Sequence, residues 1–181
     1  MKKKLLFIGF YLFWVSTLFA QFSSINNYVT RTWSSADGLP GNSVLDILQS
    51  KDGYLYFGTY ECLVKFDGFE FENLNKYSDL KMDFISARSI FEDSNGFMWV
   101  GSNDEGIQKF SRDSVEHIST ENGLPNNSVR SFIEDRFGNV WVGTASGVVY
   151  ITSEGSVVKP AVPFSYISYS HDDNFVFPVY E

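Results

Sequence analysis

An internal repeat constrains the fold of this chain more than any other feature of its sequence. Three segments, 43–58, 86–101 and 128–143, align without a gap, at offsets of 43 and then 42 residues. A further match, Asp-Gly-Leu-Pro at 37–40 against Asn-Gly-Leu-Pro at 122–125, lies 85 residues apart, the sum of the two offsets. A period of about 40 to 45 residues is typical of the blades of a β-propeller.

Each repeat contains the signals of four short strands. In the first repeat we expect strands at about 43–49, 54–58, 62–66 and 69–74, because apolar and aromatic residues alternate there between glycine-containing turns. No window shows the sustained helical spacing of apolar residues that a solenoid of helix pairs would need. The sequence therefore predicts an all-β protein with about three complete blades of four antiparallel strands, plus partial ones.

The repeat also predicts how the chain is divided. We expect an orphan outer strand and the loop that leads into the first blade at 21–42. The blades follow at 43–85, 86–127 and 128–164, and a partial fourth blade at 165–181. Four or more blades are needed to close a propeller. We therefore interpret the chain as the truncated N-terminal part of a larger protein, or as a fragment that assembles with other copies.

The first 20 residues have the composition of a secretory signal peptide. Three lysines at 2–4 precede an apolar stretch at 5–19, and we expect cleavage between Ala20 and Gln21. The stretch is short for a membrane-spanning helix, although an uncleaved anchor stays open as an alternative. Removing the signal leaves 11 basic and 22 acidic residues, a net charge of −11, which disfavours nucleic acid as a partner. We predict an exported, periplasmic or extracytoplasmic protein.

Large aromatic residues recur at one position of the repeat, as Tyr56, Trp99 and Trp141. An aromatic cage for a ligand would need these rings to converge on one place. Because they occur once in every repeat, we interpret them instead as wedges that fill the space between neighbouring blades.

The sequence contains no motif of an enzyme, a metal site or a cofactor site. The two histidines, His117 and His171, have no partner at the spacing of metal ligands, and no nucleophile elbow or phosphate-binding loop is present. The acidic turns at 93–96 and 135–138 suggest calcium, but a single Asp that caps a glycine turn explains each of them without a metal. We therefore expect a non-enzymatic protein without a cofactor.

The candidate binding surface follows from the topology of a blade. The loops between the second and third strands lie on the same face as the Gly-Leu-Pro segments, and they differ among the repeats while the strands do not. An alternative explanation is that the sequences of these exposed loops drift because nothing constrains them. The candidate ligand-binding residues in these loops are Tyr60, Glu61, Asn103, Asp104, Glu105 and Ser146. Their acidic groups favour a polar neutral or cationic ligand, such as an oligosaccharide, or a loop of a partner protein.

Two elements together resemble a known family. Gly-Leu-Pro-x-Asn-Ser-Val, at 38–44 and 123–129, is followed by Asp-x-x-Gly-x-x-Trp-x-Gly, most completely at 135–143. This combination resembles the two-component regulator propeller repeats. The second repeat departs from the pattern at 80–82 (Leu-Lys-Met), and Cys62 stands where the family has Gly.

The resemblance implies the extracytoplasmic sensor part of a bacterial signalling protein. In such proteins the propeller is usually followed by an immunoglobulin-like domain, a membrane helix and a cytoplasmic output module. The output module is often a histidine kinase or a diguanylate cyclase. We therefore expect a ligand-sensing or binding propeller module. The alternatives are a structural propeller that mediates protein contacts and a secreted propeller lyase.

Overall fold

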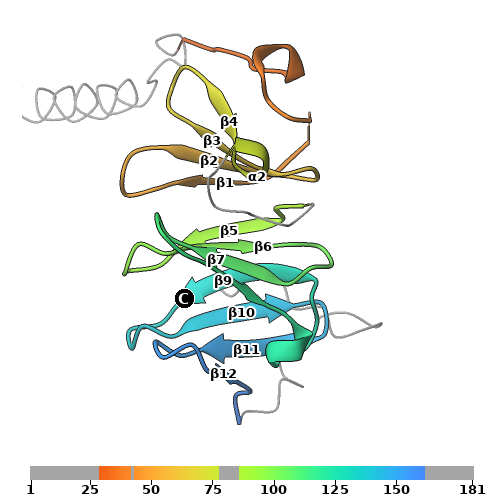
Figure 1. Cartoon of the computed structure of the whole chain (residues 1–181), viewed down its shortest axis with the longest axis vertical. Coiled ribbons are helices and arrows are strands. Elements are labelled where there is room, and N and C mark those ends of the chain that lie inside the picture. Colours follow the sequence, from red (N-terminus) through yellow and green to blue (C-terminus); the bar gives the residue numbers. More distant parts are fainter. Residues whose placement is uncertain (1–28, 42, 78–85, 162–181) are drawn as a thin grey trace, which may run out of the picture. The chain divides into compact units, whose positions relative to one another are not determined.

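The structure is a computed structural model, and it describes residues 29–41, 43–77 and 86–161. Within this part the chain forms three four-stranded sheets, one after another along the sequence (Figure 1), which we call blades 1, 2 and 3. Blade 1 consists of β1 (Val44–Gln49), β2 (Leu55–Thr59), β3 (Leu63–Phe66) and β4 (Phe71–Asn73). Blade 2 consists of β5 (Ser89–Glu92), β6 (Met98–Gly101), β7 (Ile107–Phe110) and β8 (Val115–Ile118). Blade 3 consists of β9 (Val129–Glu134), β10 (Val140–Thr144), β11 (Gly147–Ile151) and β12 (Val157–Val158).

Every blade is an antiparallel meander in which consecutive strands are neighbours. Strand β5 contacts both β1 and β9, so the first strands of the three blades lie beside one another. The all-β propeller-blade architecture predicted from the repeat is confirmed, because each repeat supplies one complete sheet.

The hydrophobic core lies between the blades. One cluster joins blades 1 and 2 and contains Tyr56, Leu63, Ile90 and Val100. A second cluster joins blades 2 and 3 around Trp99, which is 2% exposed. The interpretation of Tyr56 and Trp99 as wedges between blades is therefore confirmed. Trp141, the third aromatic of the set, packs against Tyr150 with the ring centroids 5.1 Å apart.

Glycine lies at or next to the end of the second strand in blades 1 and 2, because the next blade approaches closely there. A Cβ atom on Gly58 would lie 2.5 Å from the carbonyl oxygen of Ala87, and one on Gly101 would lie 2.6 Å from Cγ1 of Val129. No side chain fits at such distances. The Gly of the Trp-x-Gly motif is thus a packing requirement between blades.

The Gly-Leu-Pro segments form matching turns before blades 1 and 3. Ser34 and Ser119 each cap a short 3₁₀ turn, at Ser35–Asp37 and Thr120–Asn122, and Gly38 and Gly123 follow with φ of 96° and 106°. A side chain would be strained at these positive φ values, which explains the glycine. The leucine that follows, Leu39 or Leu124, is buried.

Hydrogen bonds link each blade to the next at the turns between first and second strands. The backbone N–H of Lys51 donates to the carboxylate of Glu92 at 2.7 Å. One repeat later, the backbone N–H of Ser94 donates to Glu134 at 2.7 Å, and the Ser94 hydroxyl donates to the same carboxylate at 2.5 Å. Because the same link occurs at both junctions, the blades share one mode of packing.

Three parts of the chain differ from the expected elements or lie outside the described residues. Strand β4 begins at Phe71, and Leu74 starts a short helix, α2 (Leu74–Tyr77), where a strand is expected. Residues 29–34 form no strand with the described residues, so the outer strand expected around them stays a prediction. The expected signal peptide and fourth blade lie outside the described residues. No helix in the described ranges has the length and hydropathy of a membrane span.

Candidate functional site

The predicted binding residues lie on the loops between the second and third strands of the blades. We call this surface, together with the Gly-Leu-Pro turns beside it, the rim. A Cβ atom on Gly41 would lie 3.6 Å from Oε1 of Glu61, and the amide of Asn126 donates to the hydroxyl of Ser146 at 3.1 Å. These contacts confirm that the loops and the Gly-Leu-Pro turns share one face.

Hydrogen bonds hold the β6–β7 loop of blade 2 in place. The backbone N–H of Gly106 donates to the carbonyl oxygen of Asn127 at 2.9 Å, and that of Asn103 donates to the Ser86 hydroxyl at 3.0 Å. Nε2 of His117 lies 2.6 Å from the carbonyl oxygen of Glu105. This loop therefore presents Asn103 and Asp104 from a fixed backbone.

Two arginines that are absent from the predicted set of binding residues, Arg88 and Arg130, also lie at this rim. Nη1 of Arg88 donates to Oδ1 of Asn103 at 3.0 Å. Burial and the neighbouring charge of Arg88 lower the pKa of Arg130, while the carboxylate of Asp104 acts in the opposite direction. The rim thus carries cations beside its acidic groups, so its charge does not by itself favour a neutral or cationic ligand.

A signal for these arginines exists in the sequence. Arg88 and Arg130 occupy the same position of the repeat, where the first repeat has Leu45. A charged residue that recurs at the start of an inner strand indicates a function other than core packing, because inner strands are otherwise rich in apolar residues. This position lies outside the loops between the second and third strands, so the differences among those loops do not point to it.

The predicted residues are only partly brought together. Asn103 and Asp104 lie with Arg88 and Arg130, as described above, and Ser146 lies with Asn126. Tyr60 is 55% exposed, and within the described ranges no hydrogen bond joins it to the β6–β7 loop. Tyr60 therefore offers an accessible ring at the blade 1 end of the rim.

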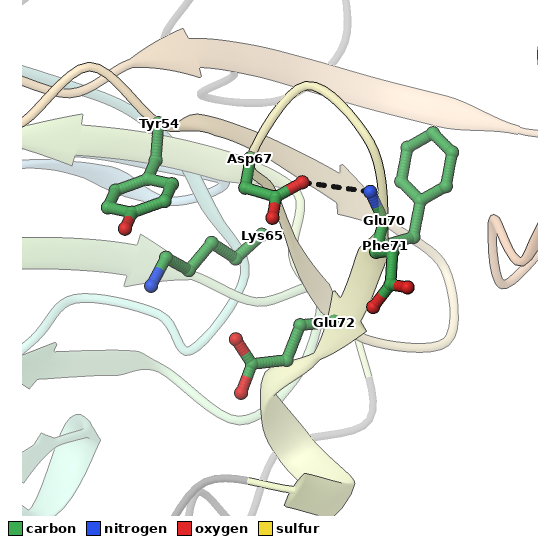
Figure 2. A pocket seen from close by; sticks show the side chains of 6 residues that line it. All are labelled: Tyr54, Lys65, Asp67, Glu70, Phe71 and Glu72. Atoms are coloured by element: carbon green, nitrogen blue, oxygen red, sulfur yellow. Dashed lines mark hydrogen bonds between the residues drawn. The ribbon is translucent and has the colours of Figure 1, made fainter.

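Two pockets lie around blade 1, away from the predicted residues. The first, which we call the hairpin pocket, has a volume of about 380 Å³. It is lined by Tyr54, Lys65, Asp67, Glu70, Phe71 and Glu72. Figure 2 shows the side chain of Lys65 beside the Tyr54 ring, with the ammonium 3.9 Å from the ring centroid. The carboxylate of Asp67 accepts hydrogen bonds from the backbone N–H groups of Glu70 and Phe69, which lower its pKa.

The second pocket, the inter-blade pocket, has a volume of about 430 Å³ and lies between blades 1 and 2. It opens on the face of the turns that join first to second and third to fourth strands, opposite the rim. Its lining residues are Ser50, Asp52, Tyr54, Tyr56, Lys65, Leu74, Glu92, Gly96, Met98, Phe110, Ser111 and Arg112.

The two acidic turns are occupied by protein hydrogen bonds. Asp93 accepts from the backbone N–H groups of Asn95 and Phe97, and Asp135 accepts from those of Phe137 and Asn139. In the described ranges no three residues among His, Cys, Asp and Glu lie together as metal ligands would. The prediction that single Asp residues cap these turns is confirmed.

The repeats match one family of known proteins. The sequence model of the family described as "two component regulator propeller" matches residues 38–61, 80–104 and 123–146. The chain is similar to the extracellular domain of BT3049 from B. thetaiotaomicron, named as a hybrid two component system. The identity is 24%, the TM-score is 0.57, and the match covers 65% of this chain and 16% of that one. No curated protein matches the chain significantly.

The chain is also similar to the extracellular domain of BT4673 from the same organism. The identity is 19%, the TM-score is 0.46, and the match covers 74% of this chain and 23% of that one. The chain therefore spans less than a quarter of the length of both relatives. At these identities the likeness to BT3049 concerns the fold.

Proposed function

The chain belongs to the two component regulator propeller family, and from this premise we propose that it is an extracytoplasmic ligand-sensing module of a bacterial signal-transduction protein. The extracellular domains of the solved relatives support the location outside the cytoplasm. The basic and apolar start of the sequence supports export.

The observation that carries the proposal is the hydrogen bond between Arg88 and Asn103 on the rim. It joins a side chain next to the inner strand of blade 2 to a loop that differs among the repeats. A charged group held in a fixed position beside variable loops is suited to binding a polar ligand. The exposed Tyr60 adds an aromatic ring, on which the apolar face of a sugar can pack.

We expect the ligand to be an oligosaccharide. The hydroxyl groups of a sugar bind to both donors and acceptors, and the rim offers the guanidinium groups of Arg88 and Arg130 together with the carboxylate of Asp104. A loop of a partner protein is the alternative, and the experiment below distinguishes the two.

The test is titration of the chain with defined neutral and uronic acid-containing trisaccharides, followed by nuclear magnetic resonance. We expect shifts at rim residues, and loss of binding in Tyr60→Ala and Arg88→Ala variants. Asp113→Ala is the control, because Asp113 is exposed on the opposite face. Lys51 and Ser94 lie on the same face as Asp113 but would not serve as controls, because their side chains form hydrogen bonds between neighbouring blades.

Binding that survives both rim variants would reject the rim as the site. Absence of any response to saccharides, with capture of a peptide loop at the rim, would favour the protein-binding alternative.

The proposal assigns no catalysis to this module. A lyase would need a histidine or paired carboxylates converging on one place. His117 lies on the outer strand β8, and its ring nitrogen contacts the carbonyl oxygen of Glu105. This contact supports a structural role for His117.

A further inference from the structure

The junctions between the blades are filled differently. Between blades 2 and 3, Trp99 occupies the space, and its indole N–H donates to Asp93 at 2.9 Å. Lys109 covers this site, with its ammonium 4.7 Å from the ring centroids of Trp99 and Phe97. Little room is left for a ligand, since Trp99 is 2% exposed.

Repeat 1 departs from this arrangement at two linked positions. Tyr56 stands where repeats 2 and 3 have Trp, and Ser50 stands where they have Asp. Without the carboxylate at position 50, the hydrogen bond to the aromatic side chain is lost. The smaller phenol leaves part of the junction unfilled, and the inter-blade pocket of about 430 Å³ lies there. Its volume is within the range of sites for small molecules.

The walls of the inter-blade pocket combine an apolar surface with opposite charges. Leu74, Met98 and Phe110 are buried and present apolar side chains to the pocket. Two carboxylates and two cations also line it, and these are Asp52, Glu92, Lys65 and Arg112. The formal charges of these four groups sum to zero, so a ligand with a net charge would meet as much repulsion as attraction.

Several of these polar groups are available to a ligand. Among the described residues, Lys65 and Arg112 form no ion pair, although the ammonium of Lys65 also packs on the Tyr54 ring. The hydroxyl of Tyr56 has no hydrogen-bond partner in the described ranges. Burial, together with the charge of Asp52, raises the pKa of Tyr56 to about 12, so the hydroxyl stays a donor at neutral pH.

We propose that the inter-blade pocket binds a small zwitterion of the α-amino acid type with an apolar side chain. The carboxylate of the ligand pairs with Arg112 or Lys65, and its ammonium group pairs with Asp52 or Glu92. The apolar side chain packs on Met98 and Phe110. This site is separate from the rim, and it does not depend on the function proposed there.

The experiment compares four probes by calorimetry with the full chain. L-phenylalanine carries both charges, 3-phenylpropionate only the negative one, phenethylamine only the positive one, and methyl glucoside neither. We expect binding of phenylalanine and at least about tenfold weaker binding of the other three, because each lacks one or both charge-assisted contacts. Equal binding of either singly charged probe, or of the glucoside, would overturn the assignment to a zwitterion.

Two sets of variants test whether the ligand binds in the inter-blade pocket. Ser50→Asp combined with Tyr56→Trp restores the sequence of the other repeats, fills the pocket and should abolish binding. Should this variant fail to fold, Arg112→Ala and Asp52→Ala test the same site, with an expected loss of about tenfold each. Asp113→Ala, next to Arg112 but outside the pocket, is the matched control. Retained binding in the folded filled variant, or in both alanine variants, would reject the pocket. No binding of phenylalanine at millimolar concentration would also reject it.

Discussion

The indole nitrogen of Trp99 donates a hydrogen bond of 2.9 Å to the carboxylate of Asp93, six residues earlier in the chain. Trp141 and Asp135 repeat this bond at the same distance in blade 3. The carboxylate thus fixes both the turn before the second strand and the ring that fills the junction. In repeats 2 and 3 a single Asp therefore couples the shape of a turn to the position of the aromatic ring on the second strand.

We expect Asp93→Ala to destabilise the chain by about 2 to 4 kcal/mol, because three donors lose their acceptor and the indole N–H is buried. Urea unfolding monitored by tryptophan fluorescence measures the change. Asp113→Ala, at an exposed position, should have almost no effect. A loss for Asp93→Ala no larger than for this control would contradict the proposed role.

Gly101→Ala should destabilise the chain by about 1 to 3 kcal/mol through overpacking, because the new Cβ would meet Val129. Val129→Ala removes the Cγ1 atom 2.6 Å from the new Cβ, so the double variant should lose less stability than the sum of the two single losses, although Oγ of Ser89 stays 2.6 Å away. The measurement is a double-mutant cycle of unfolding free energies. Strictly additive effects of the two substitutions would show that they do not meet.

The hydrogen bonds between Ser94 and Glu134 should contribute to the packing of blade 2 on blade 3. Glu134→Ala removes the acceptor for two donors, and we expect a loss of about 1 to 2 kcal/mol. Ser94→Ala removes only the hydroxyl and should cost less. In a double-mutant cycle the two substitutions should show coupling, and an interaction energy of zero would indicate that the bond contributes nothing.

Stability should depend on the ionisation of Asp135. Desolvation acts to raise its pKa, but hydrogen bonds from Asn139 and Trp141 outweigh it and lower the pKa to about 2. The ordinary value is about 3.9, so the stabilisation is present above that pH and is lost as the pH falls toward 2. The unfolding free energy of the natural chain should therefore fall more steeply between pH 4 and pH 2 than that of Asp135→Asn. If the unfolding free energies of the two proteins changed in parallel with pH, the proposed contribution of the Asp135 carboxylate would be contradicted.

The sequence predicts the architecture well because the repeat determines it. Three aligned segments give three meanders, and the recurring aromatic position gives the wedge between the blades. The turn at Asp93 is also predictable, because Asp with Gly three residues later is a turn signal. The link from Asp93 to Trp99 crosses the turn between two strands, and strand patterns alone do not reveal it.

The candidate sites are harder to predict, for physical reasons. Arg88 reaches the rim from beside an inner strand, so a comparison of loops misses it. The inter-blade pocket depends on the volume that Tyr56 leaves unfilled, and this depends on side chains from two blades. Helix α2 begins at Leu74, which also fits the apolar pattern of a strand, so this pattern does not reveal where strand β4 ends.

The hydrogen bonds between neighbouring blades all run in the same direction along the series of blades. Each carboxylate, in Glu92 or Glu134, receives donors from the blade before it, so the two edges of a blade are not interchangeable. At the equivalent position blade 1 has Gln49, whose neutral amide forms a hydrogen bond roughly half as strong as that of a carboxylate. In a ring whose other blades all have a glutamate at this position, the seam at Gln49 would be the weakest. Opening and closing of that ring would be concentrated there rather than shared among the blades.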